Sequence, residues 1–365
     1  MVESMRRGTW GAARVGILSI VLASGSDAPV CAQEHIALES SFLFYGDNTE
    51  FRNPFREGET IFGTAIRLAA RADIDARVSV ALGVFANQRF GGDDAFDQVR
   101  PLVALAVRGR RSYFVLGTLP GAGSAVAEGP DRHGPHGLLP PLQRETLAFD
   151  RPYEAGLQWT FGGRRLRHDL WLNWQQVNTA QHRERFDTGV AAELRAIGRL
   201  HVPFQVHVVH EGGQLFASGP VADSAAAATG IIVRSNEQSS RTVALEIYGV
   251  AGRHVPDRAA RGRSRNGAGV FGRASVTRRG WRGHVIVWRG NDFVKDEGDA
   301  NYLAVRRDGT RYRGIRDYAE GGLTRTLRLA DTARVEVSAR LHRVEKHLEY
   351  SYRVIGVASV DWWQR

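Results

Sequence analysis

The sequence predicts an all-β chain that closes into a single antiparallel transmembrane β-barrel of about sixteen strands. Three observations lead to this prediction. Side chains alternate in polarity with a period of two residues, short turns alternate with long connections, and no helical stripe follows residue 33. A period of two places successive side chains on opposite faces of a strand. Since no apolar run is long enough for a membrane helix, only a closed barrel would cross a bilayer.

Residues 167–176, RHDLWLNWQQ, show the alternation clearly. Leucines and Trp174 share one parity, while charged and amide residues share the other. The pattern recurs over 62–71, 78–84, 153–161, 186–194 and 334–341. The polar parity also carries small residues such as Gly63, Ala81 and Gly156. A solvated sandwich face usually carries more lysine, threonine and glutamate, so we expect the polar side to face a barrel interior and the apolar side to face lipid.

The strands are placed in order by this alternation and by the turns between them. They are expected at 35–46, 58–73, 76–90, 96–109, 111–120, 153–162, 164–178, 184–197, 200–211, 228–236, 241–254, 268–279, 281–290, 317–330, 333–346 and 350–363. An even number puts both termini at the rim of short periplasmic turns, with long loops outside. A further hairpin within 300–317 would change the count, so fourteen to eighteen strands remain open.

The N-terminal 32 residues have the composition of a cleavable signal peptide. Arg6 and Arg7 precede a short apolar run over 15–23, and Val30-Cys31-Ala32 offers small residues for cleavage. The mature barrel is then 33–365. A soluble N-terminal helix, or lipidation at Cys31, is a weaker alternative. Cys31 is the only cysteine, so an exported barrel would be held by pairing and packing alone.

The final strand, 352–363, ends in Trp362 and Trp363. Here the chain resembles bacterial outer-membrane β-barrel proteins of the porin-like kind, whose last strand usually ends in an aromatic residue. This sequence departs from that pattern, because Gln364 and Arg365 follow Trp363. The resemblance implies an outer membrane of a Gram-negative-type bacterium, contact with lipid and lipopolysaccharide, and recognition of the last strand by the barrel-insertion machinery. Aromatics near strand ends are expected at the membrane interfaces, namely Tyr153, Trp159, Trp174, Trp281, Trp362 and Trp363.

The predicted function is a porin-like channel for small hydrophilic solutes with a modest preference for anions. Charged rings that line a pore set its ion preference, and arginines outnumber carboxylates on the inward parity. The pore-lining candidates are Arg67, Arg71, Arg77, Arg167, Asp169, Arg185, Arg273, Arg334, Glu336, Arg340 and Arg353. The main alternative is an export channel for an acidic polysaccharide. The basic run 258–265 resembles a nucleic-acid patch only in composition, so no nucleic-acid partner is expected.

An outer-membrane lipid hydrolase is the less favoured alternative, and we expect no enzyme. Such an enzyme needs a serine and a histidine within hydrogen-bond reach, oriented by a third group. His207 and His342 are predicted to face the interior and His168 to face lipid, but no adjacent serine motif and no G-x-S-x-G accompanies them.

Neither a metal nor a cofactor is expected from the sequence. His133 and His136 lack nearby carboxylates in a strand or helix frame. The acidic segment 290–302, GNDFVKDEGDANY, lacks the spacing of a calcium loop and is expected to be solvated. Loop 120–152 is the longest connection. Its apolar stretch 138–142 fits either an inward fold against the wall or an ordinary surface loop, and the sequence does not separate the two.

Overall fold

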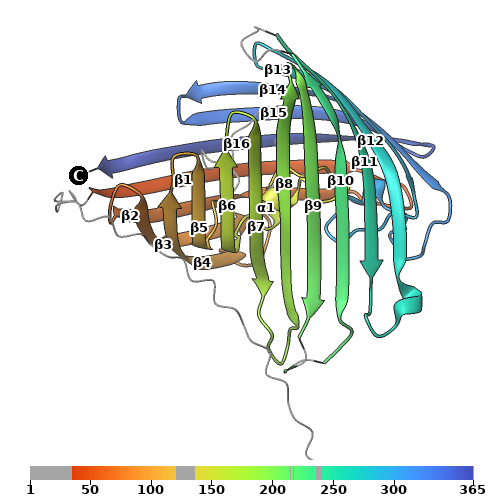
Figure 1. The fold of residues 1–365 in the computed structure, drawn as a ribbon, viewed down its shortest axis with the longest axis horizontal. Helices are drawn as coiled ribbons and strands as arrows, with labels where there is room; N and C mark the ends of the chain where they lie inside the picture. Colours follow the sequence, from red (N-terminus) through yellow and green to blue (C-terminus); the bar gives the residue numbers. More distant parts are fainter. Residues whose placement is uncertain (1–34, 121–135, 214, 217, 236–240, 365) are drawn as a thin grey trace, which may run out of the picture. The chain divides into compact units, whose positions relative to one another are not determined.

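A computed structural model describes residues 35–120, 136–213, 215–216, 218–235 and 241–364. Within this part of the chain sixteen strands form one closed antiparallel barrel, in which each strand pairs with the next and β16 pairs with β1 (Figure 1). The predicted fold class and strand number are therefore confirmed. None of the described helices is long and apolar enough to span a membrane. The predicted signal peptide, residues 1–32, lies outside the described residues.

The strand bounds follow the sequence pattern closely. The strands are β1 (His35–Glu50), β2 (Glu59–Asp73), β3 (Val78–Arg89), β4 (Gln98–Arg108), β5 (Ser112–Thr118), β6 (Ala155–Gly162), β7 (Leu166–Gln176), β8 (Glu184–Ile197), β9 (Leu200–Gly212), β10 (Ala222–Arg234), β11 (Arg241–Val255), β12 (Arg265–Arg278), β13 (Trp281–Asn291), β14 (Ile315–Ala330), β15 (Ala333–Val344) and β16 (His347–Gln364). The described residues also form three short helices, α1 (Leu147–Asp150), η2 (Arg261–Arg263) and η3 (Ala300–Tyr302). β10 begins at Ala222 rather than at 228, because the alanines at 225–228 carry no polarity contrast.

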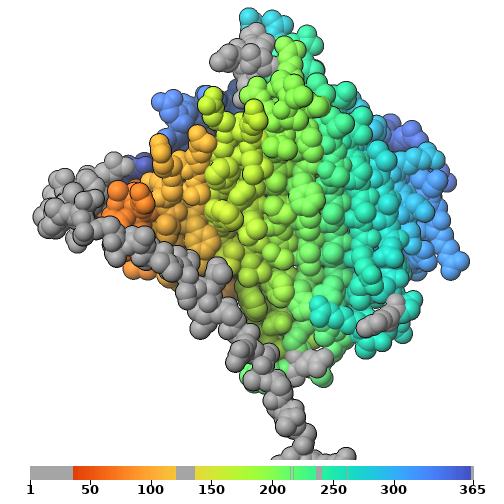
Figure 2. All heavy atoms as spheres, in the orientation of Figure 1, coloured from red at the N-terminus to blue at the C-terminus, as the bar shows by residue number. Residues whose placement is uncertain are grey.

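β11 shows which side of the wall is apolar. Leu245 and Ile247 are 52% and 55% exposed, whereas Glu246 and Tyr248, which alternate with them, are 1% and 3% exposed. The apolar parity therefore points outward and the polar parity points into the barrel. The face formed by β6–β12 is a continuous wall in the space-filling view (Figure 2). A ring of strands with apolar residues outside and polar residues inside is the pattern of a transmembrane barrel.

Residues 136–150, here called the inner segment, fold into the barrel. Leu138, Leu139 and Leu142 are 2% exposed or less and belong to the main buried cluster, together with Trp171 of β7. The Leu139 amide donates to Oε1 of Gln205 on β9 at 2.9 Å. Helix α1 follows in the same segment and lies behind β6–β8 in Figure 1. The apolar stretch thus packs against the inner wall, and the surface-loop alternative is wrong.

The acidic segment, residues 290–302, is also buried, so the expectation of a solvated loop is wrong. Phe293 and Lys295 are each 1% exposed. The Asp299 amide donates to the Pro140 carbonyl at 2.9 Å, which pairs this segment with the inner segment. A Cβ at Gly298 would lie 2.5 Å from the Pro141 carbonyl oxygen, so this close approach requires glycine. The acidic composition predicts a solvated loop, but composition alone does not show that another loop covers the segment.

Candidate functional site

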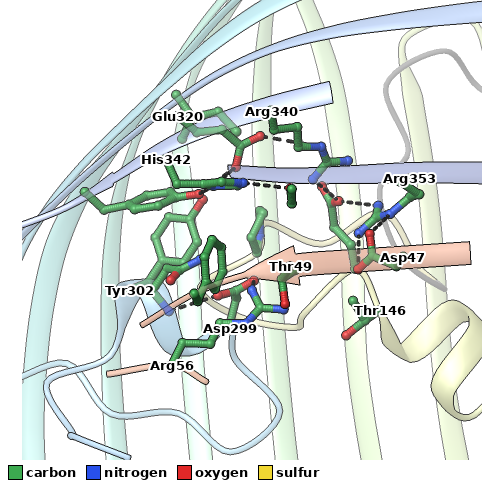
Figure 3. Close-up of a pocket in the computed structure, with 17 residues that line it drawn as sticks. Asp47, Thr49, Arg56, Thr146, Asp299, Tyr302, Glu320, Arg340, His342 and Arg353 are labelled. Carbon is green, nitrogen blue, oxygen red and sulfur yellow. Dashed lines mark hydrogen bonds and ion pairs between the residues drawn. The ribbon is translucent and has the colours of Figure 1, made fainter. Parts of the chain in front are cut away.

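A pocket lies inside the barrel where strands from the two chain ends meet. β1 contributes Asp47 and Thr49, β14 contributes Glu320, and β15 contributes Arg340 and His342 (Figure 3). The inner segment and the acidic segment close the opposite side with Thr146, Asp299 and Tyr302 (Figure 3). β16 completes the lining with Ser351 and Arg353. Closure of the sheet between β1 and β16 therefore assembles the pocket.

Ser351 and His342 form the central contact of the pocket. The register of β15 with β16 places Arg340 opposite Ser351 and His342 opposite Glu349. Ser351 and His342 are therefore diagonal neighbours on the inner face, close enough for their side chains to meet. His342 Nε2 lies 2.8 Å from Ser351 Oγ. The two side chains are almost fully buried, with 3% of His342 and 6% of Ser351 exposed.

Tyr318 and Glu320 of β14 orient the histidine. The Tyr318 hydroxyl lies 2.8 Å from His342 Nδ1 and donates its proton to Glu320 Oε2 at 2.6 Å. A hydroxyl has one proton, so Nδ1 of His342 must be the donor to the Tyr318 oxygen. In the neutral ring Nε2 then carries the lone pair and accepts the Ser351 proton. This is the tautomer that a general base needs beside a serine nucleophile.

Several ion pairs hold the wall around this contact. Oε2 of Glu145, on the inner segment, receives Nη1 of Arg340 at 3.0 Å and Nη1 of Arg353 at 2.9 Å. Arg353 Nε also donates to Oδ1 of Asp47 at 2.8 Å. The inner segment is thus tied to β15 and β16 through one carboxylate, directly beside Ser351.

Tyr302 and Arg56, two of the loop residues that line this pocket, keep fixed protonation states. Burial raises the pKa of Tyr302 well above its usual value, so its hydroxyl stays neutral. Burial alone would lower the pKa of Arg56, but Asp299, whose Oδ2 lies 2.9 Å from Arg56 Nη1, raises it. The pocket therefore carries a permanent cation and a phenol at its edge, and the histidine is the group suited to proton transfer.

A second buried group has the composition of a metal site. Ligand atoms of Asp187, His207 and Glu297 lie within 4.8 Å of one another. Two of these side chains come from β8 and β9, which are not neighbours of β16 in the strand order, and the third comes from the acidic segment.

Ten of the predicted pore-lining residues lie on the inward parity of their strands. They are Arg67, Arg71, Arg167, Asp169, Arg185, Arg273, Arg334, Glu336, Arg340 and Arg353. Arg77 is a correction, because it precedes β3 in an exposed turn whose amides are held by Asp75. That these residues line a conducting pore stays a prediction. Among them, Arg340 and Arg353 meet at the pocket beside Ser351.

Four of the predicted interface aromatics point outward, with Trp159, Trp174, Trp281 and Trp362 between 43% and 65% exposed. Tyr153 does not. Its ring centroid lies 5.3 Å from that of Phe85, which is 1% exposed in an interior cluster. It follows the inner segment and turns inward with it. The side chain of Trp363 lies outside the described residues.

No local sequence motif marks the serine partner of His342. Ser351 is nine positions away, and the contact depends on the two-residue turn at Glu345 and Lys346. Folding the chain at that turn pairs Val344 with His347, which brings the two inward residues together. The available signal was therefore the hairpin register, since no sequence motif surrounds the serine.

Comparison with known proteins gives a family and a fold. The sequence model of a family described as lipid A 3'-O-deacylase-type matches residues 28–360. No curated protein matches the chain. The expectation that the chain is not an enzyme is corrected by the family match, because that family is one of enzymes.

Solved outer-membrane proteins share the barrel at very low identity. A loop-deletion form of OmpT from Vibrio cholerae is 7% identical, with a TM-score of 0.54 over 89% of this chain and 99% of that chain. OccK8 (OprE) from Pseudomonas aeruginosa is 10% identical, with a TM-score of 0.52 over 90% and 98%. At such identity the likeness concerns the outer-membrane β-barrel fold alone.

Proposed function

Because the chain belongs to the lipid A 3'-O-deacylase-type family, we propose that it is an outer-membrane ester hydrolase with Ser351 as its nucleophile. The proposed substrate is the ester that joins an acyl chain to the 3'-oxygen of lipid A. The observation that carries the proposal is the 2.8 Å contact between Ser351 Oγ and His342 Nε2, with Tyr318 and Glu320 behind the ring. Nucleophile, base and orienting group stand in the relation that acyl transfer requires.

The proposed reaction has two steps. Ser351 Oγ attacks the ester carbonyl carbon while His342 Nε2 takes the serine proton, and the 3'-alcohol leaves with that proton. Water then attacks the acyl-serine, with His342 again taking a proton and returning it to Ser351. Glu320, 3.5 Å from His342 Nδ1 and linked to it through Tyr318, stabilises the imidazolium that forms in both steps.

Arg340 is the proposed donor to the oxyanion. It stands opposite Ser351 in the register, and its Nε is buried without a hydrogen-bond partner. The nearest carboxylate oxygen, Glu320 Oε1, is 3.8 Å away, while Nη1 is bound to Glu145. A fixed donor in a water-poor site stabilises the charge that develops in the transition state.

The test uses the full-length protein in detergent micelles with lipid A. Mass spectrometry should detect loss of one acyl chain and release of the matching fatty acid. Ser351→Ala should reduce the rate by about three orders of magnitude or more, the range seen when a serine nucleophile is removed. Ser338→Ala is the matched control, since Ser338 is an equally buried inward serine on β15 with no contact to His342. Equal activity of Ser351→Ala and wild type would reject this nucleophile.

The channel function has less support than the hydrolase. The inner segment and the acidic segment occupy the barrel, and inward arginines such as Arg185 and Arg273 are bound to carboxylates. Paired charges leave little excess to select anions. In this proposal the lipid and lipopolysaccharide of the outer membrane surround the barrel, and the lipopolysaccharide also supplies the lipid A substrate. Transport of small solutes, polysaccharide export and the insertion machinery as a partner stay predictions.

A further inference from the structure

We propose that Asp187, His207 and Glu297 form a binding site for one divalent cation of the zinc class. None of the three residues lines the proposed hydrolase pocket, and the inference does not depend on that activity. Asp187 of β8 and His207 of β9 are side by side on the inner wall, and Glu297 reaches them from the acidic segment. Their side chains are 2% exposed or less.

The hydrogen bonds of His207 leave one ring nitrogen for a cation. Nδ1 lies 3.1 Å from the carbonyl oxygen of Leu142, which can only accept, so Nδ1 carries a proton. Nε2 faces Oδ2 of Asp187 at 3.4 Å and Oε2 of Glu297 at 3.8 Å. In a neutral ring Nε2 has a lone pair, which would face the lone pairs of Asp187 Oδ2 and Glu297 Oε2. A metal ion between the three atoms removes that conflict, and a carbonyl on Nδ1 is the usual support of a metal-binding histidine.

Both carboxylates are held through the oxygen that points away from the shared centre. Oδ1 of Asp187 accepts from Asn173 and Gln175, each at 2.9 Å. Oε1 of Glu297 accepts from Arg151 at 2.8 Å and Gln175 at 2.9 Å. Oε2 of Glu297 is buried without a hydrogen-bond partner. Oδ2 of Asp187 accepts from Trp171 Nε1 at 2.8 Å and also makes the 3.4 Å contact with His207 Nε2, the nitrogen that the cation would share. Such outer partners orient ligands toward a metal.

The separations of His207 Nε2 from the two carboxylate oxygens are close to those around a transition-metal dication. Bonds of about 2.0–2.2 Å in a tetrahedral zinc site put neighbouring ligand atoms about 3.3–3.6 Å apart. The separations from His207 Nε2 to the two carboxylate oxygens are 3.4 and 3.8 Å. One imidazole with two carboxylates suits zinc better than the all-oxygen sites of calcium or magnesium.

Nearby cations limit the affinity of the site. Arg151 and Arg185 bind Glu297, and Lys295 is buried close by. Arg185 also binds Glu211 at 3.1 Å, so its charge is partly compensated.

The backbone of Glu297 is strained. Its φ is +67°, a conformation unusual for a residue other than glycine. Such strained positions occur preferentially at functional sites.

The proposed cation would join three parts of the interior. Glu297 belongs to the acidic segment, Leu142 to the inner segment, and Asp187 with His207 to the wall. A cation at this centre therefore fastens both inward segments to β8 and β9. Zinc should raise the melting temperature of the protein because it binds the folded arrangement alone.

The test is a zinc titration of the chelator-treated full-length protein in detergent, followed by calorimetry and by metal analysis after gel filtration. We expect one zinc per chain and a higher melting temperature. Glu297→Gln, which removes a ligand oxygen with little change in shape, should weaken binding by about tenfold or more. His210→Gln is the control, because His210 also contacts a carboxylate, that of Asp223, at 2.8 Å but lies outside the group.

Three results would overturn the proposal. They are the absence of stoichiometric zinc binding to the wild type, equal affinity of wild type and Glu297→Gln, and a doubly protonated His207 in nitrogen-15 spectra at neutral pH. The last would mean that a proton, bound to Nε2, already neutralises the two carboxylates.

Discussion

Tyr318 is the residue on which the orientation of His342 depends. Its hydroxyl separates the ring from Glu320, and without it Nδ1 faces Oε2 across 3.5 Å. A hydrogen bond of that length is weak. By bridging Glu320 and His342, Tyr318 thus stabilises the tautomer of His342 that carries its proton on Nδ1.

Replacing Tyr318 by phenylalanine should lower kcat by about tenfold to a hundredfold, less than the roughly 10²–10⁴-fold that a general base contributes, because the base itself remains. KM should change little, because the hydroxyl lies behind the histidine. The measurement is steady-state release of fatty acid from lipid A. Tyr248→Phe is the matched control, since the Tyr248 hydroxyl likewise donates to a glutamate two residues away, Glu246, at 3.1 Å. An equal loss in both variants would mean a general effect on the fold.

The sequence placed single residues on the correct side of the wall but did not pair them. The inward parity of Arg340, His342 and Arg353 follows from local alternation. The contact of His342 with Ser351 follows from register, which depends on the turn between two strands. Tyr153 was misplaced for a related reason, because its direction is set by a segment that folds inward rather than by the strand it precedes.

At the level of elements, the inner segment decides what the barrel interior contains. His136 begins its described part, stacked on Trp171 with ring centroids 3.8 Å apart. Its Nδ1 lies 3.1 Å from Asp169 and its Nε2 3.3 Å from Glu154. The sequence suggested the apolar contact of 138–142 but gave no sign of this ion pair, because Asp169 and Glu154 belong to other strands or loops.

Attachment of the inner segment should weaken at high pH. Burial alone would lower the pKa of His136, but Glu154 and Asp169 raise it to about 10 from the ordinary 6.5. A raised pKa means that the stabilisation is complete below pH 6.5 and is lost as the pH rises through about 10. Trypsin cleavage after Arg144, measured between pH 7 and 10.5, should therefore accelerate toward the upper end.

His136→Gln provides the comparison, because glutamine has no charge to lose. Its cleavage should be faster than that of the wild type at pH 7 and should show a flatter pH dependence once the intrinsic pH profile of trypsin is subtracted. Identical profiles for the two proteins would show that the ion pairs of His136 do not hold the segment.

At the level of the whole molecule, the closure of the barrel wall and the filling of the barrel interior have different origins. Pairing of β1 with β16 closes the wall, and the alternation of side chains is enough to anticipate it. Filling comes from loops that fold back, and their contacts involve strands far apart in the sequence. The fold class and strand number were therefore accessible from the sequence, whereas an enzyme-like interior was not.

The filled interior predicts that the wild-type protein conducts ions poorly in a planar bilayer. Leu138, Leu139 and Leu142, with Phe293 of the acidic segment, pack into one buried cluster inside the described barrel, where a porin would hold water. Deleting residues 124–144 removes the apolar part of the inner segment and should open conductance, while the strands that form the wall remain. Heat-dependent mobility on a denaturing gel checks that the deleted protein is still a closed barrel. Under a salt gradient the opened barrel should show a modest anion-sided reversal potential, because the inward Arg67, whose Nη2 donates to the Leu119 carbonyl oxygen at 2.8 Å rather than to a carboxylate, is not part of the deletion. A cation-sided potential would contradict the predicted role of the inward arginines, and high conductance of the wild type would contradict the filled interior.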